Sequence, residues 1–327
     1  MMGPLVSIIT PCHNGEKHVH RLLKSILIQT YDNIEFIFID DGSEDNTKKV
    51  IMSYEKEFIK RGFKLHYIYQ RNKGQAAALN VGLKTFQGDY FTWPDSDDYM
   101  EKDCIYQKVM FLENNFDYGL VRSDGFFIDE NNQKSKRKLN STKQQSPFIF
   151  EELLMEKISV IPVCYMARTS IFLDSYPHRH IYESRSGQNF QLLLPISSRS
   201  KCGYINKDLY YIYARNDSHS RKTRSFEERL HRINNIESIL LNTLPYCNCD
   251  NEKYANLIKD HYSHKRFILA IKENNIALLC EQYQTLKRRK IATRKDARHY
   301  YRVRYKLIDI MYKKYPGLIR LLKNISS

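Results

Sequence analysis

The chain has 327 residues, 42% of them hydrophobic, and carries 52 Lys and Arg against 37 Asp and Glu, a net charge of +15. It can bury a sizeable core. Since no run approaches eighteen apolar residues and the N-terminus lacks a signal-peptide pattern, we expect neither a transmembrane helix nor secretion. The seven scattered cysteines include no CxxC pair, which disfavours a zinc ribbon or disulfide framework and fits a reducing cytoplasm.

The first hundred residues alternate between two hydrophobic periods. Runs rich in β-branched and aromatic residues predict strands at 5–10, 34–40, 64–69 and 89–93. Between them, 16–30 carries an apolar stripe at helical spacing, and 43–58 opens with good N-cap residues. This alternation predicts βαβ units and a mainly parallel, doubly wound α/β sheet flanked by helices. Ligands of such sheets bind beyond the C-terminal ends of the strands.

The remainder of the chain is less regular. Residues 131–146 are polar and basic and predict an exposed loop, whereas helix-like and strand-like pieces occupy about 148–215. From 226 onward the pattern is helical and charged. We therefore expect one domain over 1–222, with two halves at 1–125 and 126–222, and a helical basic region over 223–327.

Three carboxylates stand directly behind the fourth predicted strand. Asp95, Asp97 and Asp98 lie within four residues of one another with no basic residue between them. Side chains two apart on an extended segment point the same way, so Asp95 and Asp97 are placed to face one cation. The chain has no G-x-G-x-x-G after the first strand and no P-loop motif. A site of this kind needs Mn²⁺ or Mg²⁺ to neutralise a diphosphate.

Four segments carry a family resemblance. They are VSIITPCHN, IEFIFIDDGSEDNT, NKGQAAALNVGL and GDYFTWPDSDD, in that order and at these separations. The series resembles the family 2 glycosyltransferases, a large inverting family with the GT-A nucleotide-sugar fold. The resemblance is close over residues 5–125 and looser to about 220. It implies that the chain is an enzyme and binds a UDP-linked sugar, with a nucleotide-sugar-binding half at 1–125 and an acceptor half at 126–222.

The resemblance also implies roles for residues around the nucleotide. Asp41 matches the carboxylate that reads the base, usually uracil, through its ring N–H. Pro11 and Asn14 match the loop along the nucleoside. Asn72 and Gly74 match the stretch beside the nucleotide, where glycine permits close approach of the backbone.

The same matches place the cation and the phosphates. Asp95 is expected toward the sugar or ribose and Asp97 on Mn²⁺ or Mg²⁺, which stabilises charge on the departing nucleoside diphosphate. His219 stands where relatives carry a further metal ligand. Arg215 and Arg221 are candidate phosphate contacts, although basic residues are common in this part of the chain.

The general base is where the chain departs from the family. Many relatives carry Glu-Asp in the acceptor region, and the matching pair here is Gln188-Asn189, whose amides cannot accept a proton at neutral pH. We expect this pair to contact the acceptor or donor sugar. Glu183 and Asp124 are the candidate bases.

An ordinary structural role stays open for Glu183. The alternative to a general base is an ion pair with Arg179 or Arg185. For Asn80 and Gly82, beside the nucleotide-binding stretch, packing of a helix is the alternative to a ligand contact.

Basic residues collect in the C-terminal third. Residues 221–327 hold 24 Lys and Arg against 10 Asp and Glu. One helical stripe recurs every four residues, at Arg294, Arg298, Arg302 and Lys306. A basic amphipathic helix with tyrosines binds anionic membrane surfaces. The alternative is a helix whose charges are merely solvated; no nucleic-acid-binding motif is found, so a nucleic-acid partner is not expected.

The predictions combine into one function. The segment GQNFQLLLP resembles enzymes that build bacterial capsules and other surface polysaccharides, and the Q-x-x-R-W signature of processive synthases is absent. We expect a cytoplasmic enzyme on the inner face of the membrane that adds one sugar to a lipid-linked oligosaccharide. A sugar nucleotidyltransferase is disfavoured because the loop after the first strand is not rich in glycine and arginine. A catalytically silent partner that binds nucleotide-sugar remains the alternative.

Overall fold

The computed structural model describes residues 3–128, 134–138 (backbone only), 146–158, 160–161, 164–184, 187–213 and 224–305. Contacts divide the chain into two compact units. The first unit comprises Met1–Thr223 and Ser238–Asn251, and the second comprises Arg224–Glu237 and Glu252–Ser327. The predicted boundary at 222 assigned residues 238–251 to the C-terminal region, whereas they pack with the first unit.

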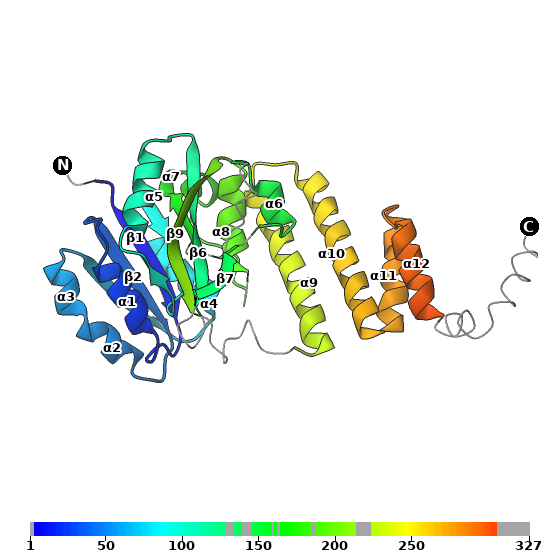
Figure 1. The fold of residues 1–327 in the computed structure, drawn as a ribbon, viewed down its shortest axis with the longest axis horizontal. Helices are drawn as coiled ribbons and strands as arrows, with labels where there is room; N and C mark the ends of the chain where they lie inside the picture. The colour runs from blue at the N-terminus through cyan, green and yellow to red at the C-terminus, as the bar shows by residue number, and fades with distance from the viewer. Residues whose placement is uncertain are drawn as a thin grey trace, which may run out of the picture. The chain divides into compact units, whose positions relative to one another are not determined.

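The first unit is built on one nine-stranded sheet (Figure 1). Its strands are β1 (Val6–Cys12), β2 (Ile34–Asp41), β3 (Lys64–Gln70), β4 (Tyr90–Thr92), β5 (Tyr99–Met100), β6 (Tyr118–Ile128), β7 (Lys134–Lys138), β8 (Tyr165–Arg168) and β9 (Lys201–Tyr213). The order is β3-β2-β1-β4-β8-β6-β9-β5, with β7 paired to β6. Strands β3, β2, β1 and β4 run parallel, and antiparallel pairs join β8 to β4 and to β6. This mainly parallel sheet spans both predicted halves of the domain.

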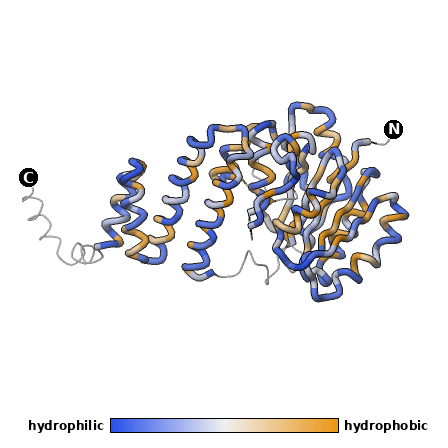
Figure 2. Tube along the Cα trace, turned by 180° about the vertical axis from the view of Figure 1, so that it is seen from behind, coloured by the Kyte–Doolittle hydropathy of each residue, from blue (hydrophilic) through white to orange (hydrophobic). Residues whose placement is uncertain are grey.

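Helices flank the sheet, as Figure 1 shows. They are α1 (Val19–Leu27), α2 (Thr47–Ser53), α3 (Glu55–Lys60), α4 (Gln75–Thr85), α5 (Cys104–Glu113), α6 (Phe150–Leu154), α7 (Thr169–Ser175) and α8 (Gln188–Ser197). Every residue of β2 is buried, and the strands form the hydrophobic interior visible in Figure 2. The predicted α/β class with a helix-flanked, mainly parallel sheet is confirmed.

Two local predictions differ from the structure. The predicted helix at 43–58 divides at Tyr54, where the Tyr54 N–H bonds to the Ile51 carbonyl in a tighter i to i−3 turn. The predicted loop at 131–146 contains the strand β7. Strand β7 is Lys-Ser-Lys-Arg-Lys on the edge of the sheet, where a strand needs no apolar face and charged residues are common.

The helical pattern predicted from 226 onward is confirmed in the described residues. The elements are α9 (Phe226–Thr243), a 3₁₀ turn η2 (Leu244–Tyr246), α10 (Asn251–Glu273), α11 (Ile276–Arg288) and α12 (Arg294–Arg304). In the second unit, α10, α11 and α12 share a small core of Phe267, Ala270, Leu279, Tyr283, Leu286 and Tyr300. Within the described part of the chain, no helix combines the length and apolar character needed to cross a bilayer.

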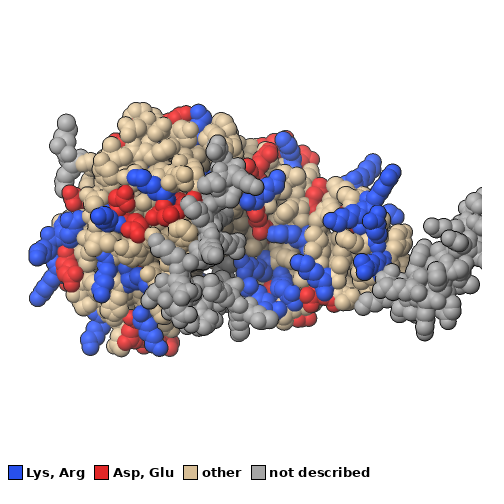
Figure 3. Space-filling view, in the orientation of Figure 1, with Lys and Arg blue, Asp and Glu red and all other residues tan. Residues whose placement is uncertain are grey.

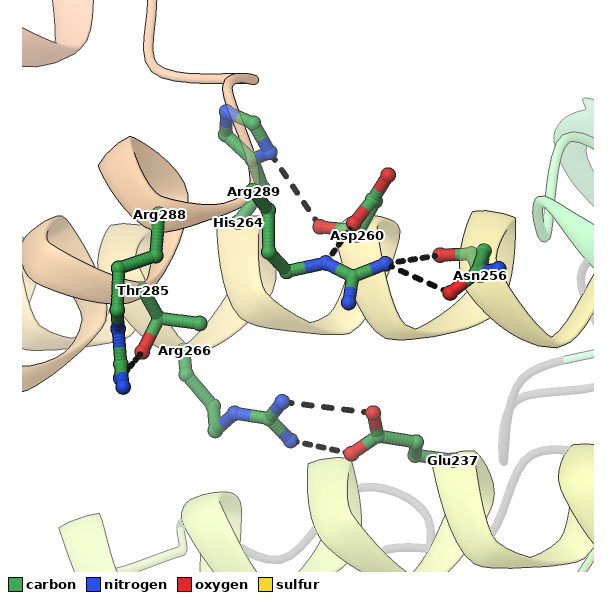
Figure 4. A network of polar contacts seen from close by, with 8 residues as sticks. All are labelled: Glu237, Asn256, Asp260, His264, Arg266, Thr285, Arg288 and Arg289. Atoms are coloured by element: carbon green, nitrogen blue, oxygen red, sulfur yellow. Dashed lines mark hydrogen bonds and ion pairs between the residues drawn. The ribbon is translucent and has the colours of Figure 1, made fainter.

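Polar contacts join the helices of the second unit (Figure 4). Arg266 of α10 pairs with Glu237 of α9, and both side chains are 15% exposed. Arg289, the C-cap residue of α11, pairs with Asp260 of α10 and also donates to Asn256 over 3.2 Å. The Arg266–Glu237 pair is the more buried of the two, so removing either partner would leave a largely buried charge without its counter-ion.

Candidate functional site

The site lies where four parallel strands end at the same edge of the sheet. Strands β1, β2 and β3 end at Cys12, Asp41 and Gln70, and β4 leads into the segment beginning at Trp93. Pro11 pairs with Ile39 of β2 and lies beyond the β1–β4 ladder, which covers only the beginning of β1. The chain topology therefore gathers the predicted polar clusters at one edge.

Asp41 organises the loop that precedes α4. Its Oδ1 accepts hydrogen bonds from the Lys73 N–H at 2.9 Å and from Gln70 Nε2 at 2.6 Å, and its Oδ2 accepts one from the Gly74 N–H at 2.9 Å. The side chain is almost fully buried. A carboxylate oxygen has two acceptor positions, so Oδ2 retains one for a ligand N–H.

Gly74 begins α4 in a conformation that other residues avoid. Its φ is +92°, and a Cβ added there would meet no protein atom within 4 Å. The requirement for glycine is therefore conformational within the described residues, rather than a lack of space. The next residue, Gln75, donates from Nε2 to Asp95 Oδ1 over 3.2 Å. This hydrogen bond connects the Asp41 loop to the segment at residues 95–98 that carries the three carboxylates.

A second polar group surrounds His13. Its Nδ1 lies 2.9 Å from the Asp41 carbonyl oxygen and 3.3 Å from Asn72 Nδ2. Asn14 occupies the left-handed region at φ +54°, and its Oδ1 accepts from the Glu44 N–H over 2.9 Å. The predicted residues Asn14, Asn72 and Asp41 thus belong to one cluster, together with His13, to which the sequence analysis assigned no role.

The acidic turn comprises residues 95–98, and its three carboxylates carry like charges that repel one another. The pKa of Asp95 is raised to about 7, mainly by burial and in part by the neighbouring Asp97, while the Gln75 hydrogen bond lowers it. Burial also raises the pKa of Asp98 well above its usual value, with Asp97 and Asp95 adding to the rise. Asp98 is buried and accepts hydrogen bonds from the Tyr210 hydroxyl and the Tyr213 N–H. Asp98 is therefore held by protein donors, and Asp95 and Asp97 form the more exposed pair.

The acceptor-half pair lies beside this turn. Asn189 Oδ1 accepts a hydrogen bond from Trp93 Nε1 over 3.0 Å, two residues before Asp95 in the chain. Gln188 is buried at the first position of α8, behind Gly187 at φ +76°. The structure thus brings Asn189 next to the segment that carries the carboxylates.

The two candidate bases have opposite environments. Glu183 is 53% exposed and lies 3.5 Å from His180 Nε2. Asp124, on β6, has no exposed surface and accepts a hydrogen bond from the Tyr204 hydroxyl. Burial argues against proton transfer from an acceptor to Asp124 and leaves Glu183 as the accessible carboxylate.

The segment around Glu183 is held by α4. Asn80 donates to the Ile181 carbonyl over 2.9 Å and accepts from the Ile181 N–H over 2.8 Å. Arg179 donates to the Phe86 carbonyl over 2.6 Å, so its guanidinium serves the backbone, and His180 is the ion-pair partner found for Glu183. Asn80 therefore has a clear structural role, and so does Gly82, where an added Cβ would lie 2.2 Å from Ile9 Cγ2.

The donor set for a cation is small. Within the described ranges, no three His, Cys, Asp or Glu side chains are grouped as a ligand set. Mg²⁺ is commonly bound through only one or two carboxylates together with substrate phosphates, so no larger set is needed. The neighbouring carboxylates Asp95 and Asp97, which repel each other, fit this mode. The predicted contacts His219, Arg215 and Arg221 lie outside the described residues, as does Arg185.

Comparisons with known proteins identify the family. The family model for glycosyl transferase family 2 matches residues 7–175. An uncharacterised glycosyltransferase of Rickettsia typhi is 31% identical over 192 residues, 55% of this chain and 57% of the relative. One of Haemophilus influenzae is 34% identical over 179 residues, 54% of this chain and 68% of the relative. The chain thus matches little more than half the length of the Rickettsia relative.

Solved structures share the fold at low sequence identity. TarS of S. aureus, in complex with UDP-GlcNAc, gives a TM-score of 0.64 at 16% identity, covering 93% of this chain and 92% of that one. The Pyrobaculum calidifontis mannosyltransferase, with GDP-Man and Mn²⁺, gives 0.52 at 14% identity, covering 96% and 88%. The chain belongs to glycosyl transferase family 2 and has its GT-A fold.

Proposed function

We propose that the chain is a metal-dependent inverting transferase that moves one sugar from a UDP-linked donor to a lipid-linked oligosaccharide of a bacterial surface polysaccharide. The observation that carries this proposal is the pair of mutually repelling carboxylates Asp95 and Asp97 at the strand ends, which a hydrogen bond from Gln75 connects to the Asp41 loop. The solved neighbours that contain UDP-GlcNAc, or GDP-Man with Mn²⁺, support a nucleotide-sugar in a GT-A site of this kind.

On the donor side, each group of the nucleotide has a residue assigned to it. Asp41 offers a remaining carboxylate acceptor to the base N–H, and Pro11, Asn14, Asn72 and Gly74 border the nucleoside. Hydrogen bonds of Asn14 with Glu44, of Asn72 with His13 and of Gly74 with Asp41 order this border before the donor arrives, which lowers the ordering cost of binding.

At the diphosphate, Asp97 is assigned to Mn²⁺ or Mg²⁺, with Asp95 toward the ribose or sugar and His219 as a further ligand. The bound cation would act as a Lewis acid and stabilise negative charge on the leaving nucleoside diphosphate. Asp97 would hold that cation, and Gln75 orients Asp95.

On the acceptor side, Glu183 is proposed as the general base. It would take the acceptor hydroxyl proton while the oxygen attacks the anomeric carbon from the face opposite the leaving group. Asn80 keeps the backbone two residues away in place, and His180 contacts the carboxylate. Gln188 and Asn189 are proposed to contact sugar hydroxyls, with the Asn189 amide oriented by Trp93.

The acceptor is proposed to reside in a membrane. The basic stripe Arg294, Arg298 and Arg302 lies on α12 and is exposed, while Lys306 lies outside the described residues. An anionic bilayer at the cytoplasmic face provides the complementary surface. The chemistry would then occur where a lipid-linked acceptor presents its sugars.

The test is a panel of nucleotide sugars incubated with the full chain and Mn²⁺, with released nucleoside diphosphate as the readout. We expect release from one donor, loss on chelation and loss in Asp97→Asn. Asp103→Asn is the matched control, because this partly exposed carboxylate makes no side-chain cap hydrogen bond. Release that persists in Asp97→Asn or without metal would contradict the proposed metal dependence.

A second experiment tests the base. Glu183→Gln is expected to lower transfer to the lipid-linked acceptor about 100-fold, in the usual range for a general base, while leaving UDP affinity unchanged. The His180→Gln variant should keep more activity than Glu183→Gln, since it leaves the carboxylate. Equal transfer by wild type and Glu183→Gln would remove Glu183 from this role.

A catalytically silent partner is the second candidate function. It is favoured by Gln188-Asn189, the neutral pair at the position where relatives carry acids, and by the burial of Asp124. This candidate predicts Mn²⁺-dependent UDP binding without release from any donor, even with a lipid-linked acceptor present.

A further inference from the structure

An arginine from α1 reaches the acidic turn. Arg21 Nη1 donates a hydrogen bond of 2.7 Å to the main-chain carbonyl oxygen of Asp97, 76 residues further along the chain. The guanidinium carbon of Arg21 also lies 3.4 Å from the centroid of the Tyr213 ring. Tyr213 is the last residue of β9, so one side chain joins three elements of the fold.

The other side of the turn is already fixed to β9. Asp98 accepts from the Tyr213 N–H over 3.2 Å and from the Tyr210 hydroxyl, and β5 pairs with β9 immediately afterwards. These ties hold the backbone after Asp97. Arg21 supplies the described contact on the carbonyl of Asp97 itself, the residue whose carboxylate is assigned to the cation.

The chemistry of the contact explains the choice of arginine. The turn carries three carboxylates without a basic residue between them, and the guanidinium brings one positive charge to it from a distant element. A planar guanidinium stacks on an aromatic ring while its edge donates a hydrogen bond, and an ammonium group cannot do both in a fixed orientation. Arg21 is partly buried, which limits competition from water.

We propose that Arg21 is a positioning residue for the transfer reaction: stacked on Tyr213, it holds the main chain of Asp97 so that the Asp97 carboxylate meets the cation bound to the donor diphosphate. The inference rests on the proposed metal-dependent function. Residues that orient metal ligands typically contribute about 10- to 100-fold to metal affinity or activity.

The experiment uses the full chain with Arg21→Met, Arg21→Lys and the control Lys24→Met. Lys24 is exposed on the same helix and makes none of the described hydrogen bonds to the turn. Its variant therefore removes the same charge without removing a contact to the turn. The readouts are the Mn²⁺ concentration that half-saturates UDP binding, and donor hydrolysis. We expect Arg21→Met to raise that concentration about 10- to 100-fold with metal-free UDP affinity unchanged, and Arg21→Lys to recover part of the loss.

Hydrogen exchange of the metal-free protein adds a readout that needs no ligand. Peptides covering residues 95–100 should exchange faster in Arg21→Met than in Lys24→Met, because the turn has lost a tie. If Arg21→Met melts below the working temperature, Tyr213→Leu carries the same test, with Tyr213→Phe as a control that keeps the ring.

The outcomes separate the two proposals. If Arg21→Met equals Lys24→Met in both exchange and Mn²⁺ dependence, the positioning role is overturned. If Arg21→Lys equals wild type in every readout, the charge alone suffices and the stacked geometry is overturned. If the wild type itself binds UDP without any Mn²⁺ dependence, the proposed metal chemistry fails together with the role of Arg21 in it, and the failure is recognised because it is not confined to a variant.

Discussion

At the residue scale, one buried carboxylate both shapes the proposed nucleotide site and remains able to serve it. Asp41 accepts three hydrogen bonds from residues 70–74, including two from backbone N–H groups. Hydrogen bonds to a charged acceptor contribute more than those to a neutral one. The loop is therefore ordered by the same group that is proposed to read the base, so changes at Asp41 should affect binding more than a single ligand contact would.

The variant Asp41→Asn tests this dual role. Replacing one carboxylate oxygen by an amide NH₂ directs a donor at a backbone donor, and hydrogen bonds to charged groups are worth about 1.5–3 kcal/mol. We expect UDP affinity, measured by calorimetry, to fall about 10- to 100-fold. Asp32→Asn is the control, since Asp32 is 77% exposed and pairs with Arg61 at 3.3 Å on the surface. Unchanged affinity in Asp41→Asn would exclude Asp41 from both roles.

At the element scale, α4 connects the donor side to the acceptor side of the site. Its N-terminus carries Gly74 and Gln75 beside the carboxylates, and two turns later Asn80 makes paired hydrogen bonds to Ile181. Gly82 lets the helix approach β1 and β2 closely, because an added Cβ would lie 2.2 Å from Ile9 and 2.9 Å from Ile39. The position of α4 thus fixes where the Glu183 segment stands.

Asn80→Ala should reveal that connection. It leaves the buried N–H and carbonyl of Ile181 without the partner they have now, at about 1–3 kcal/mol for each unsatisfied group. We expect a lower free energy of unfolding in denaturant and a lower rate of transfer, with UDP affinity unchanged. The exposed Lys84 on the same helix gives the control Lys84→Ala. A loss of UDP affinity as large as the loss of rate would instead show a general disturbance of α4.

In the second unit, α12 begins with a capping box whose contribution to stability can be measured. Thr293 accepts from the Asp296 N–H over 3.1 Å, and Asp296 accepts from the Thr293 N–H over 2.8 Å. Thr293→Ala should lower the free energy of unfolding of this unit by about 1 kcal/mol, the usual effect of removing a threonine N-cap. Thr285→Ala, an exposed hydroxyl within α11, is the control. If both variants lower the free energy of unfolding equally, the Thr293 cap contributes no more than a hydroxyl within a helix.

The same box predicts a dependence on pH. Burial raises the pKa of Asp296, but hydrogen bonds from Thr293 and His264 outweigh it, so the pKa lies below its usual value. A lowered pKa stabilises the folded state above the unfolded value of about 3.9, and this stabilisation is lost as pH falls through the folded value. The stability difference between wild type and Asp296→Asn should therefore be constant near neutral pH and shrink below about pH 4. If the stability difference instead grows on acidification, the pKa of Asp296 is not lowered in the folded state.

At the scale of the whole molecule, the sequence predicts what depends on local pattern. Strands β1, β2 and β4 are almost wholly buried and read as continuous apolar runs, and the partly exposed edge strand β3 is rich in aromatic residues, so β1 to β4 and the polar groups at their ends were predictable. Contacts between distant segments were not. Arg21 and Asp97 are separated by 76 positions, and Asn80 and Ile181 by 101, so each contact depends on packing of elements that no periodicity specifies. The strand β7 was missed because an edge strand needs no apolar face.

The uneven distribution of charge is also a property of the whole molecule. Lys and Arg gather over the α11–α12 hairpin of the second unit, as Figure 3 shows. The exposed cations are Lys287, Arg288, Lys290, Arg294, Lys295, Arg298, Arg302 and Arg304. Tyr301 and Tyr305 are exposed on the same hairpin and stack at 6.1 Å between centroids. Tyrosines beside basic residues suit the interface between a bilayer and water, and the apolar face of the hairpin is already occupied by its own core.

This surface predicts membrane binding that depends on salt. Each Lys or Arg near an anionic bilayer contributes about 1 kcal/mol, so reversing Lys290, Lys295 and Arg298 to Glu should weaken binding to phosphatidylserine vesicles at least 100-fold. Wild-type binding should disappear near about 1 M salt, where the Debye length is about 3 Å. The matched control reverses Lys49, Lys56 and Lys60, which are exposed on α2 and α3 in the first unit. If both triple variants bind alike, the membrane contact is not made by the hairpin, and if salt has no effect, it is not electrostatic. Retained donor hydrolysis in the hairpin variant would show that the basic surface serves the location of the acceptor rather than the chemistry at Asp97.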